Sequence, residues 1–267
     1  MDRLIKFPLD DAPGIAKLRA VVQRDPASDS AATALGIALA GAGCSYEAAV
    51  LLRPRRALWK NTPEAGTAKS ALDAQTWWNK NWRAFAQLSQ ANKREDALAL
   101  LGNRAVGYWD QPGLLMHLGG FAAETDKLDL AEHIFRRVCV LAERGLPKMT
   151  MSAFAYAGPA ALIDVLARRG RPNEALARHR DLTPNHGNAM AHEIQTARLQ
   201  VLAGQIDAAL ETTARLLVTA LSERTGYSRT FRLDTADLDP DFAPLREHAE
   251  WAALRADPKS WLRAKSG

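Results

Sequence analysis

The chain has 267 residues, of which 47% are apolar and 24% charged, and its formal net charge is +5. This composition is ordinary for a globular protein, and the charge is weaker than the basic footprint of a dedicated nucleic-acid binder. The two cysteines are far apart in the sequence, and we expect both to be reduced thiols. The N-terminus has no apolar leader and the chain has no run of 18 apolar residues, so we expect no signal peptide, no membrane span and a cytoplasmic location. Abundant Ala and Leu favour helix, and the Ala- and Arg-rich usage is typical of a high-GC bacterium.

The N-terminal part of the chain predicts a short helix followed by the first of several helix pairs. Residues 13–24 are expected to form the first helix, which ends at Asp25-Pro26 because proline cannot continue a helix. From there on, a turn residue stands five positions before an alanine at regular intervals. Gly, Asn and Asp tolerate the left-handed backbone that closes a helix, and alanine lets two helices cross closely. These pairs are Gly43 and Ala48, Asn92 and Ala97, Asp126 and Ala131, Gly170 and Ala175, and Gly204 and Ala209.

Two further positions keep a constant distance from each alanine. Thirteen residues before the alanines stand Leu35, Ala84, Leu118, Leu162 and Thr196, and glycine follows the first and third of these. Four residues after the alanines stand Leu52, Leu101, Phe135, His179 and Thr213. Large apolar side chains at the first three of these positions are what a packed second helix needs.

This pattern resembles the tetratricopeptide repeat, which carries Leu-Gly on its first helix, Ala on its second and a large apolar residue four positions later. Ala97 and Ala131 are 34 residues apart, as are Ala175 and Ala209, and this is the period of the family. The longer intervals before Ala97 and Ala175 imply insertions. The resemblance implies an all-α fold, a right-handed α-solenoid of about five antiparallel helix pairs with N- and C-terminal capping helices.

Proline-rich and polar segments of the sequence predict where helices end and where the repeats stop. Pro54 is expected to end or kink a helix, residues 61–66 to start a new one, and residues 148–158 to add a turn or helix. After residue 224 the chain becomes polar, and then an apolar segment that starts at Asp239 predicts the C-terminal cap that a solenoid needs. We therefore expect a capping helix in residues 1–28, repeats in 29–224, and an irregular segment and cap in 225–267.

Aromatic residues gather on one predicted helix before Asn92. Trp78, Trp82 and Phe85 have the spacing of one helix face. We expect Phe85 to be packed. For the two tryptophans two interpretations stay open, because tryptophan both fills cores and anchors interfaces: they fill the space that the insertion leaves, or they form a platform for a partner.

The other candidate sites have weaker patterns. Alternating aspartates in residues 237–241 lack the glycine and glutamate of a calcium loop, so we expect them to cap helix starts. His179, His186 and His192 form no metal-binding motif, and we expect them to be solvated. The basic run Arg53–Arg56 is either a solvated edge or a contact for an acidic partner or nucleic acid. The sequence contains no phosphate loop, no dinucleotide fingerprint and no nucleophile elbow. We therefore expect that the protein is not an enzyme and that it binds neither a metal nor a cofactor.

The resemblance also implies where a partner binds, because the first helices of tetratricopeptide pairs line a concave groove. Transferred to this chain, the ligand-facing positions and the aromatic cluster give Trp78, Asn79, Trp82, Arg83, Met116, His117, Glu124, Asp164, Arg168, Gln195 and Arg198. This mixture of charges differs from the Lys/Asn clamp with which some family members hold a C-terminal carboxylate, so we do not expect chaperone-tail binding.

The function that these observations predict is a protein-binding scaffold or adaptor, with another protein or peptide in the groove. A bacterial secretion chaperone and an immunity protein that neutralises a toxin are examples of this class. Two alternatives stay open: a helical-repeat protein that binds single-stranded RNA, for which binding would depend steeply on salt, and a metal-dependent enzyme with chemistry around residues 179–192.

Overall fold

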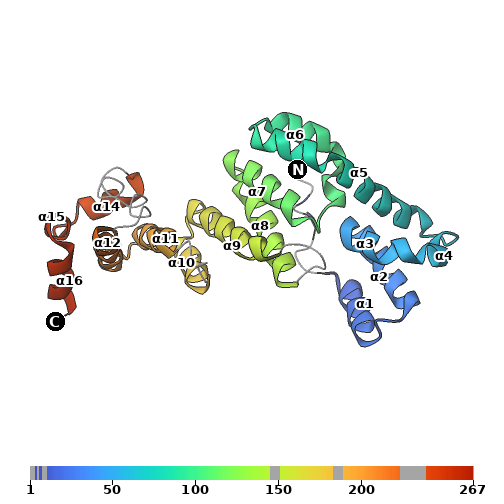
Figure 1. Cartoon of the computed structure of the whole chain (residues 1–267), viewed down its shortest axis with the longest axis horizontal. Helices are drawn as coiled ribbons and strands as arrows, with labels where there is room; N and C mark the ends of the chain where they lie inside the picture. The colour runs from blue at the N-terminus through green and yellow to red at the C-terminus, as the bar shows by residue number, and fades with distance from the viewer. Residues whose placement is uncertain are drawn as a thin grey trace. The chain divides into compact units, whose positions relative to one another are not determined.

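The protein is all α-helical over the part of the chain that the structure describes, as predicted. This computed structural model describes residues 4, 6–7, 11–144, 151–182, 189–222 and 239–266, which contain no β-strand. The chain folds into two compact units, Met1–Ala161 (unit 1) and Leu162–Gly267 (unit 2). In both units, many helices pack against the helix that precedes or follows them in the chain (Figure 1).

Unit 1 consists of a short first helix and helix pairs that follow it. Its elements are α1 (Pro13–Arg24), α2 (Asp29–Gly41), α3 (Ser45–Leu52), η2 (Arg53–Arg55), α4 (Arg56–Trp59), α5 (Ala65–Gln90), α6 (Arg94–Leu101), η3 (Gly102–Gly107), α7 (Pro112–Glu124), α8 (Leu128–Arg144) and the first part of α9 (Met151–Arg168). The helix predicted for residues 13–24 is confirmed as α1.

Unit 2 contains the end of α9, three further long helices and a group of short C-terminal helices. These are α10 (Pro172–Asp181), α11 (Ala189–Leu202), α12 (Ile206–Ser222), η5 (Pro240–Phe242), α14 (Ala243–Arg246), α15 (Trp251–Ala256) and α16 (Pro258–Ser266).

The predicted turn residues adopt the left-handed backbone. Their φ angles are 76° at Gly43, 58° at Asn92, 56° at Asp126, 70° at Gly170 and 72° at Gly204. After each of them, the next amide N–H donates to the carbonyl oxygen five residues before it, at 2.8–2.9 Å. This bond satisfies a carbonyl that the helix end leaves without a partner, and it reverses the chain into the next helix.

The helix crossings explain the alanines and the two Leu-Gly pairs. All five predicted alanines are fully buried, and so are the residues four positions after them. A Cβ added at Gly36 would lie 2.7 Å from Leu52 Cγ, and one at Gly119 would lie 2.5 Å from Phe135 Cε1. Since real Cβ atoms do not approach that closely, only glycine allows these helices to pack at the observed distance.

The insertions lengthen particular helices. The first builds α4 and the N-terminal half of the 26-residue α5, which packs on α2 and α3 and buries Trp59, Ala68 and Ala71 in one core cluster with Leu52. The second lies at the N-terminus of α9, where residues 151–158 are helical as expected. Residues 148–150 of this prediction lie outside the described residues.

A partly buried ionic network attaches α1 to the helices after it. Arg19 of α1 pairs with Glu47 of α3 at 2.6 Å, and it also donates to Asp11. Asp11 in turn pairs with Arg144 of α8 at 2.8 Å. Because each buried charge has an opposite partner, the network is compatible with burial and fixes α1 against α3 and α8.

The segment between α6 and α7 crosses the start of α3 and caps it. Helix α3 begins after Cys44, whose side chain makes no capping hydrogen bond. Instead, Asp110 Oδ2 accepts from the Glu47 amide at 2.7 Å, and the Trp109 amide donates to Gly43 O at 2.9 Å. A carboxylate near the first turn of a helix satisfies donors that otherwise have no partner. This contact joins positions 63 residues apart.

Asp110 is fully buried, and one of its carboxyl oxygens has no hydrogen-bond partner. Burial is the main cause that raises the pKa of this carboxyl to about 7; the nearby Glu47 carboxylate contributes to the rise, whereas backbone amides and the Arg137 guanidinium oppose it. The group therefore holds a proton in the folded state over a range of pH in which an ordinary aspartate is ionised.

The C-terminal segment covers α11 and α12 of unit 2. Phe242, Leu245 and Leu254 are buried against these helices, and Arg198 of α11 donates to Asp241 at 3.0 Å from Nε. Asp239 accepts from the Asp241 amide at the start of η5, so this aspartate caps a helix start as expected. Asp237 lies outside the described residues.

Candidate partner-binding site

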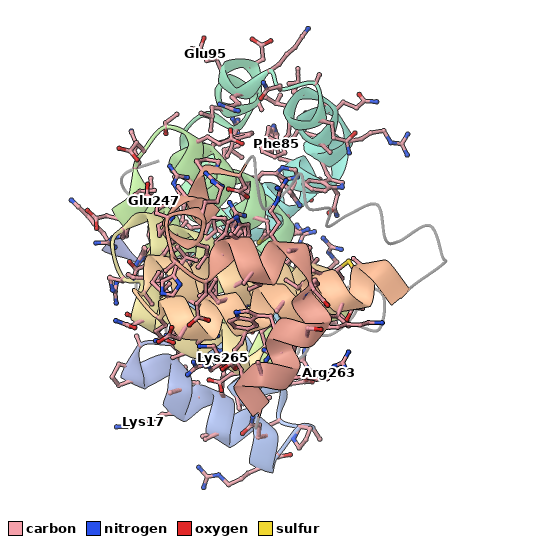
Figure 2. The ribbon with its side chains drawn as sticks, turned by 90° about the vertical axis from the view of Figure 1, so that its left-hand side faces the viewer. Lys17, Phe85, Glu95, Glu247, Arg263 and Lys265 are labelled. Carbon is pink, nitrogen blue, oxygen red and sulfur yellow. The ribbon has the colours of Figure 1, made fainter. Side chains whose placement is uncertain are left out.

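The aromatic cluster of α5 is largely a core feature with one exposed end. The ring centroids of Trp78 lie 5.1 Å from Trp82 and 5.8 Å from Phe85. Phe85 is fully buried, as predicted, and Figure 2 shows it between the helix ribbons, while Glu95 points outward. Trp78 is only 7% exposed, which corrects its inclusion among the partner-binding residues, since a side chain packed in the core has no surface for a partner. Trp82 is 38% exposed.

Residues of α7 hold Trp82 in place. Its ring lies 6.0 Å from that of His117, and a Cβ added at Gly113 would lie 3.6 Å from Trp82 Cη2. His117 Nδ1 forms a 2.7 Å hydrogen bond with the Ser89 hydroxyl at the end of α5. Burial lowers the pKa of His117, so its ring is neutral at pH 7. Trp82 therefore combines a fixed position with an exposed apolar surface, a combination common at protein interfaces.

A cleft of about 300 Å³ lies between α3 and α5. It is lined by Tyr46, Ala49, Val50, Arg53, Pro54, Gln75 and Asn79. The α3 wall is mainly apolar, and Val50 is 48% exposed there. The α5 wall consists of two side-chain amides. Residues 75, 79 and 82 are spaced along one face of α5, so the cleft and Trp82 belong to the same side of this helix.

A second cleft, of about 520 Å³, lies between α5, η3 and the start of α3 and includes Trp77, Asp73 and Arg104 in its lining. The Arg104 guanidinium lies 4.9 Å from the centre of the Trp77 ring, and Tyr108 stacks with this ring at 6.3 Å. Because these two side chains already cover Trp77, it offers less surface for an aromatic ligand than Trp82.

The remaining predicted site residues of unit 1 lie on α5 and α7. Asn79 and Arg83 are exposed, and Met116 and His117 are half-buried. Glu124 is exposed at the end of α7 and forms an ion pair with Arg94. Asn79 and Arg83 thus lie on the same helix as Trp82. Met116 and His117 lie on α7, the helix whose His117 ring contacts Trp82.

The predicted residues of unit 2 lie on α9 and α11. Asp164 and Arg168 are exposed on α9, and Gln195 is half-buried on α11. Arg198 is half-buried and pairs with Asp241, so its guanidinium already has a carboxylate partner that joins α11 to the C-terminal segment.

The expectation that the clustered histidines are solvated is wrong for His179. This residue is buried, and its Nε2 lies 2.9 Å from His192 O and 3.1 Å from Thr196 Oγ1. The two imidazole rings stack at 3.9 Å. His179 occupies the position at which the first three pairs carry a large apolar residue, and it packs as a core side chain. His186 lies outside the described residues.

The lining of the α3–α5 cleft includes residues that the sequence analysis did not select. Tyr46 and Val50 were missed because the resemblance pointed only to first helices, whereas α3 is a second helix, and Gln75 was missed because it lies in the inserted N-terminal half of α5. The available signal was the spacing of positions 46, 50 and 53, which are four and three residues apart and so lie on one helix face.

Neither a metal site nor a membrane span is evident in the described residues. They contain no group of three His, Cys, Asp or Glu side chains arranged to hold a metal ion. None of their helices combines the length and apolarity needed to cross a bilayer. The chain matches no protein-family model, no curated protein and no solved structure.

Proposed function

We propose that the protein is a protein-binding scaffold built as a right-handed solenoid of about five tetratricopeptide-like helix pairs. The observation that carries the binding function is Trp82, a tryptophan held by three aromatic neighbours and yet 38% exposed, on the same helix face as a cleft. Rigid aromatic side chains of this kind contribute large contact area at low entropic cost.

The repeated features support the architecture in this proposal. Left-handed turn residues, buried alanines and buried side chains four positions later recur at each helix pair. Stacked helix pairs present an extended surface formed from many helices, which suits an adaptor, a secretion chaperone or an immunity protein. Function depends on the site and not on the fold, so the proposal depends on Trp82 and its neighbours.

Affinity capture from the native host tests the binding function. Wild-type protein is expected to hold one partner in stoichiometric amounts, and Trp82→Ala to weaken its binding by about 30-fold, as for interface hot spots of about 2 kcal/mol. Leu58→Ala is the matched control, because Leu58 of α4 is also apolar and 50% exposed but makes no part of the cleft. Equal binding by Trp82→Ala and wild type would contradict the assignment.

A further inference from the structure

A chain of three side-chain amides ends at the α3–α5 cleft. Gln111 Nε2 donates to Gln75 Oε1 at 3.0 Å, and Gln75 Nε2 donates to Asn79 Oδ1 at 2.8 Å. Gln111 and Gln75 are buried, whereas Asn79 is exposed at the cleft. Because the oxygen of Asn79 is used by Gln75, its amide NH₂ is the group left to face the cleft, and it can only donate.

The cleft is electropositive. Arg53 is the only ionised side chain in its lining, and it makes no ion pair with any residue that the structure describes, whereas its neighbour Arg55 pairs with Asp29 at 2.8 Å. The acidic residues nearest to the lining in the sequence, Glu47 and Asp73, do not line the cleft.

Apart from Tyr46 and Arg53, the α3 side of the cleft is apolar. Ala49, Val50 and Pro54 form this side, and Val50 exposes about half of its surface. A ligand that fits must therefore combine an anionic group with an apolar neighbour. A glutamate or aspartate beside an aliphatic residue in a polypeptide has this composition.

We propose that the α3–α5 cleft binds a carboxylate side chain within an acidic segment of a partner protein. In this arrangement Arg53 pairs with the carboxylate, the Asn79 NH₂ donates to one of its oxygens, and an aliphatic side chain next to the acid contacts Val50. A donor held in place by buried amides and a cation without a partner both gain from binding an anion. The inference rests on the proposed protein-binding function.

The same observations disfavour a nucleic acid in this cleft. A strand of RNA needs several cations that follow its backbone, and only Arg53 lines the cleft.

Fluorescence anisotropy with defined probes tests the inference. The probes are a labelled, end-blocked peptide of alternating glutamate and leucine, the same peptide with glutamine for glutamate, and an oligouridine RNA. We expect the glutamate peptide to bind at least tenfold more tightly than the other two probes. Arg53→Gln and Asn79→Asp should each weaken it by about tenfold. Asn79→Asp keeps the acceptor for Gln75 and replaces the donor by an anion.

Arg56→Gln is the matched control, since Arg56 is exposed, carries the same charge and lies outside the cleft lining. It should change the affinity less than twofold, because a charge at the rim contributes little to affinity. Equal effects of Arg53→Gln and Arg56→Gln, tighter binding of the RNA, or equal binding of the glutamine peptide would each overturn the inference.

The captured partner separates failure of this inference from failure of the proposed function. If Trp82→Ala loses that partner while Arg53→Gln and Asn79→Asp retain it fully, the protein is a scaffold and the carboxylate site is wrong. If all three variants retain it as wild type does, both proposals are wrong.

Discussion

Replacing Asp110 by asparagine should change how the stability of unit 1 depends on pH. Asparagine keeps a side-chain oxygen that can accept from the Glu47 amide at the start of α3 and removes the titrating proton. In the folded protein the carboxyl has a pKa of about 7, against 3.8 for an ordinary aspartate. The folded state therefore binds more protons than the unfolded state between these values.

The sign and the magnitude follow from this difference. Because the folded pKa is raised, the stabilisation from the bound proton is complete below about pH 4 and is lost as the pH rises towards 7. A difference of about three pKa units corresponds to a loss on the order of 4 kcal/mol in the free energy of unfolding. We expect Asp110→Asn to have a stability close to wild type near pH 4 and to exceed it above pH 7.

Urea unfolding at a series of pH values measures this difference. Tryptophan fluorescence reports mainly on unit 1, which contains Trp59, Trp77, Trp78, Trp82 and Trp109. Asp73→Asn is the control, because it makes the same chemical change at a residue of α5 that is exposed. If Asp110→Asn lowers the free energy of unfolding by the same amount at every pH, the carboxyl is ionised in the folded protein and the reasoning is refuted.

Three further results are expected. Gly119→Ala should lower the free energy of unfolding by about 1–3 kcal/mol, because its Cβ would lie 2.5 Å from Phe135 Cε1, and thermal unfolding measures this. The Cys44 thiol should not react with Ellman's reagent until the protein unfolds, because it is buried and burial raises its pKa. Arg198→Ala should destabilise the C-terminal segment by about 0.5–1 kcal/mol through the lost pair with Asp241, seen as faster amide hydrogen exchange there.

Each of these results has a control. Gly120→Ala should leave stability unchanged or raise it, because no atom lies within 4 Å of a Cβ added there. Arg180→Ala removes an exposed arginine of α10 and should not change exchange in the C-terminal segment. Thiol reaction in the native protein equal to that in urea would show that the Cys44 site opens readily.

The features that the sequence predicted correctly are local in the chain. Gly43, Asn92 and Asp126 are recognisable because a left-handed turn excludes most other residues, and Ala48 because a close helix crossing excludes large ones. Both constraints act within one helix pair, so a fixed spacing is enough to reveal them. The same holds for α1, whose end is set by the following proline.

What could not be predicted depends on contacts between distant residues. Nothing near Asp110 in the sequence indicates that it caps a helix that begins 65 residues earlier, at Ser45. Trp78 and Trp82 share a helix face, so their periodicity is the same. The ring of Trp78 is buried next to that of Tyr108, which is distant in the sequence, whereas Trp82 stays 38% exposed beside His117. The α3–α5 cleft exists because the N-terminal half of the long helix α5 packs against α3, and the sequence does not indicate this contact.

The most direct measurement is hydrogen–deuterium exchange of the protein alone and with its captured partner. If α5 and the cleft form the binding surface, amides in residues 46–53 and 75–83 become protected in the complex, and those of α16 keep their exchange rates. Protection confined to α10 or α16, with unchanged exchange in residues 75–83, would contradict the assignment of the binding surface to Trp82 and its neighbours.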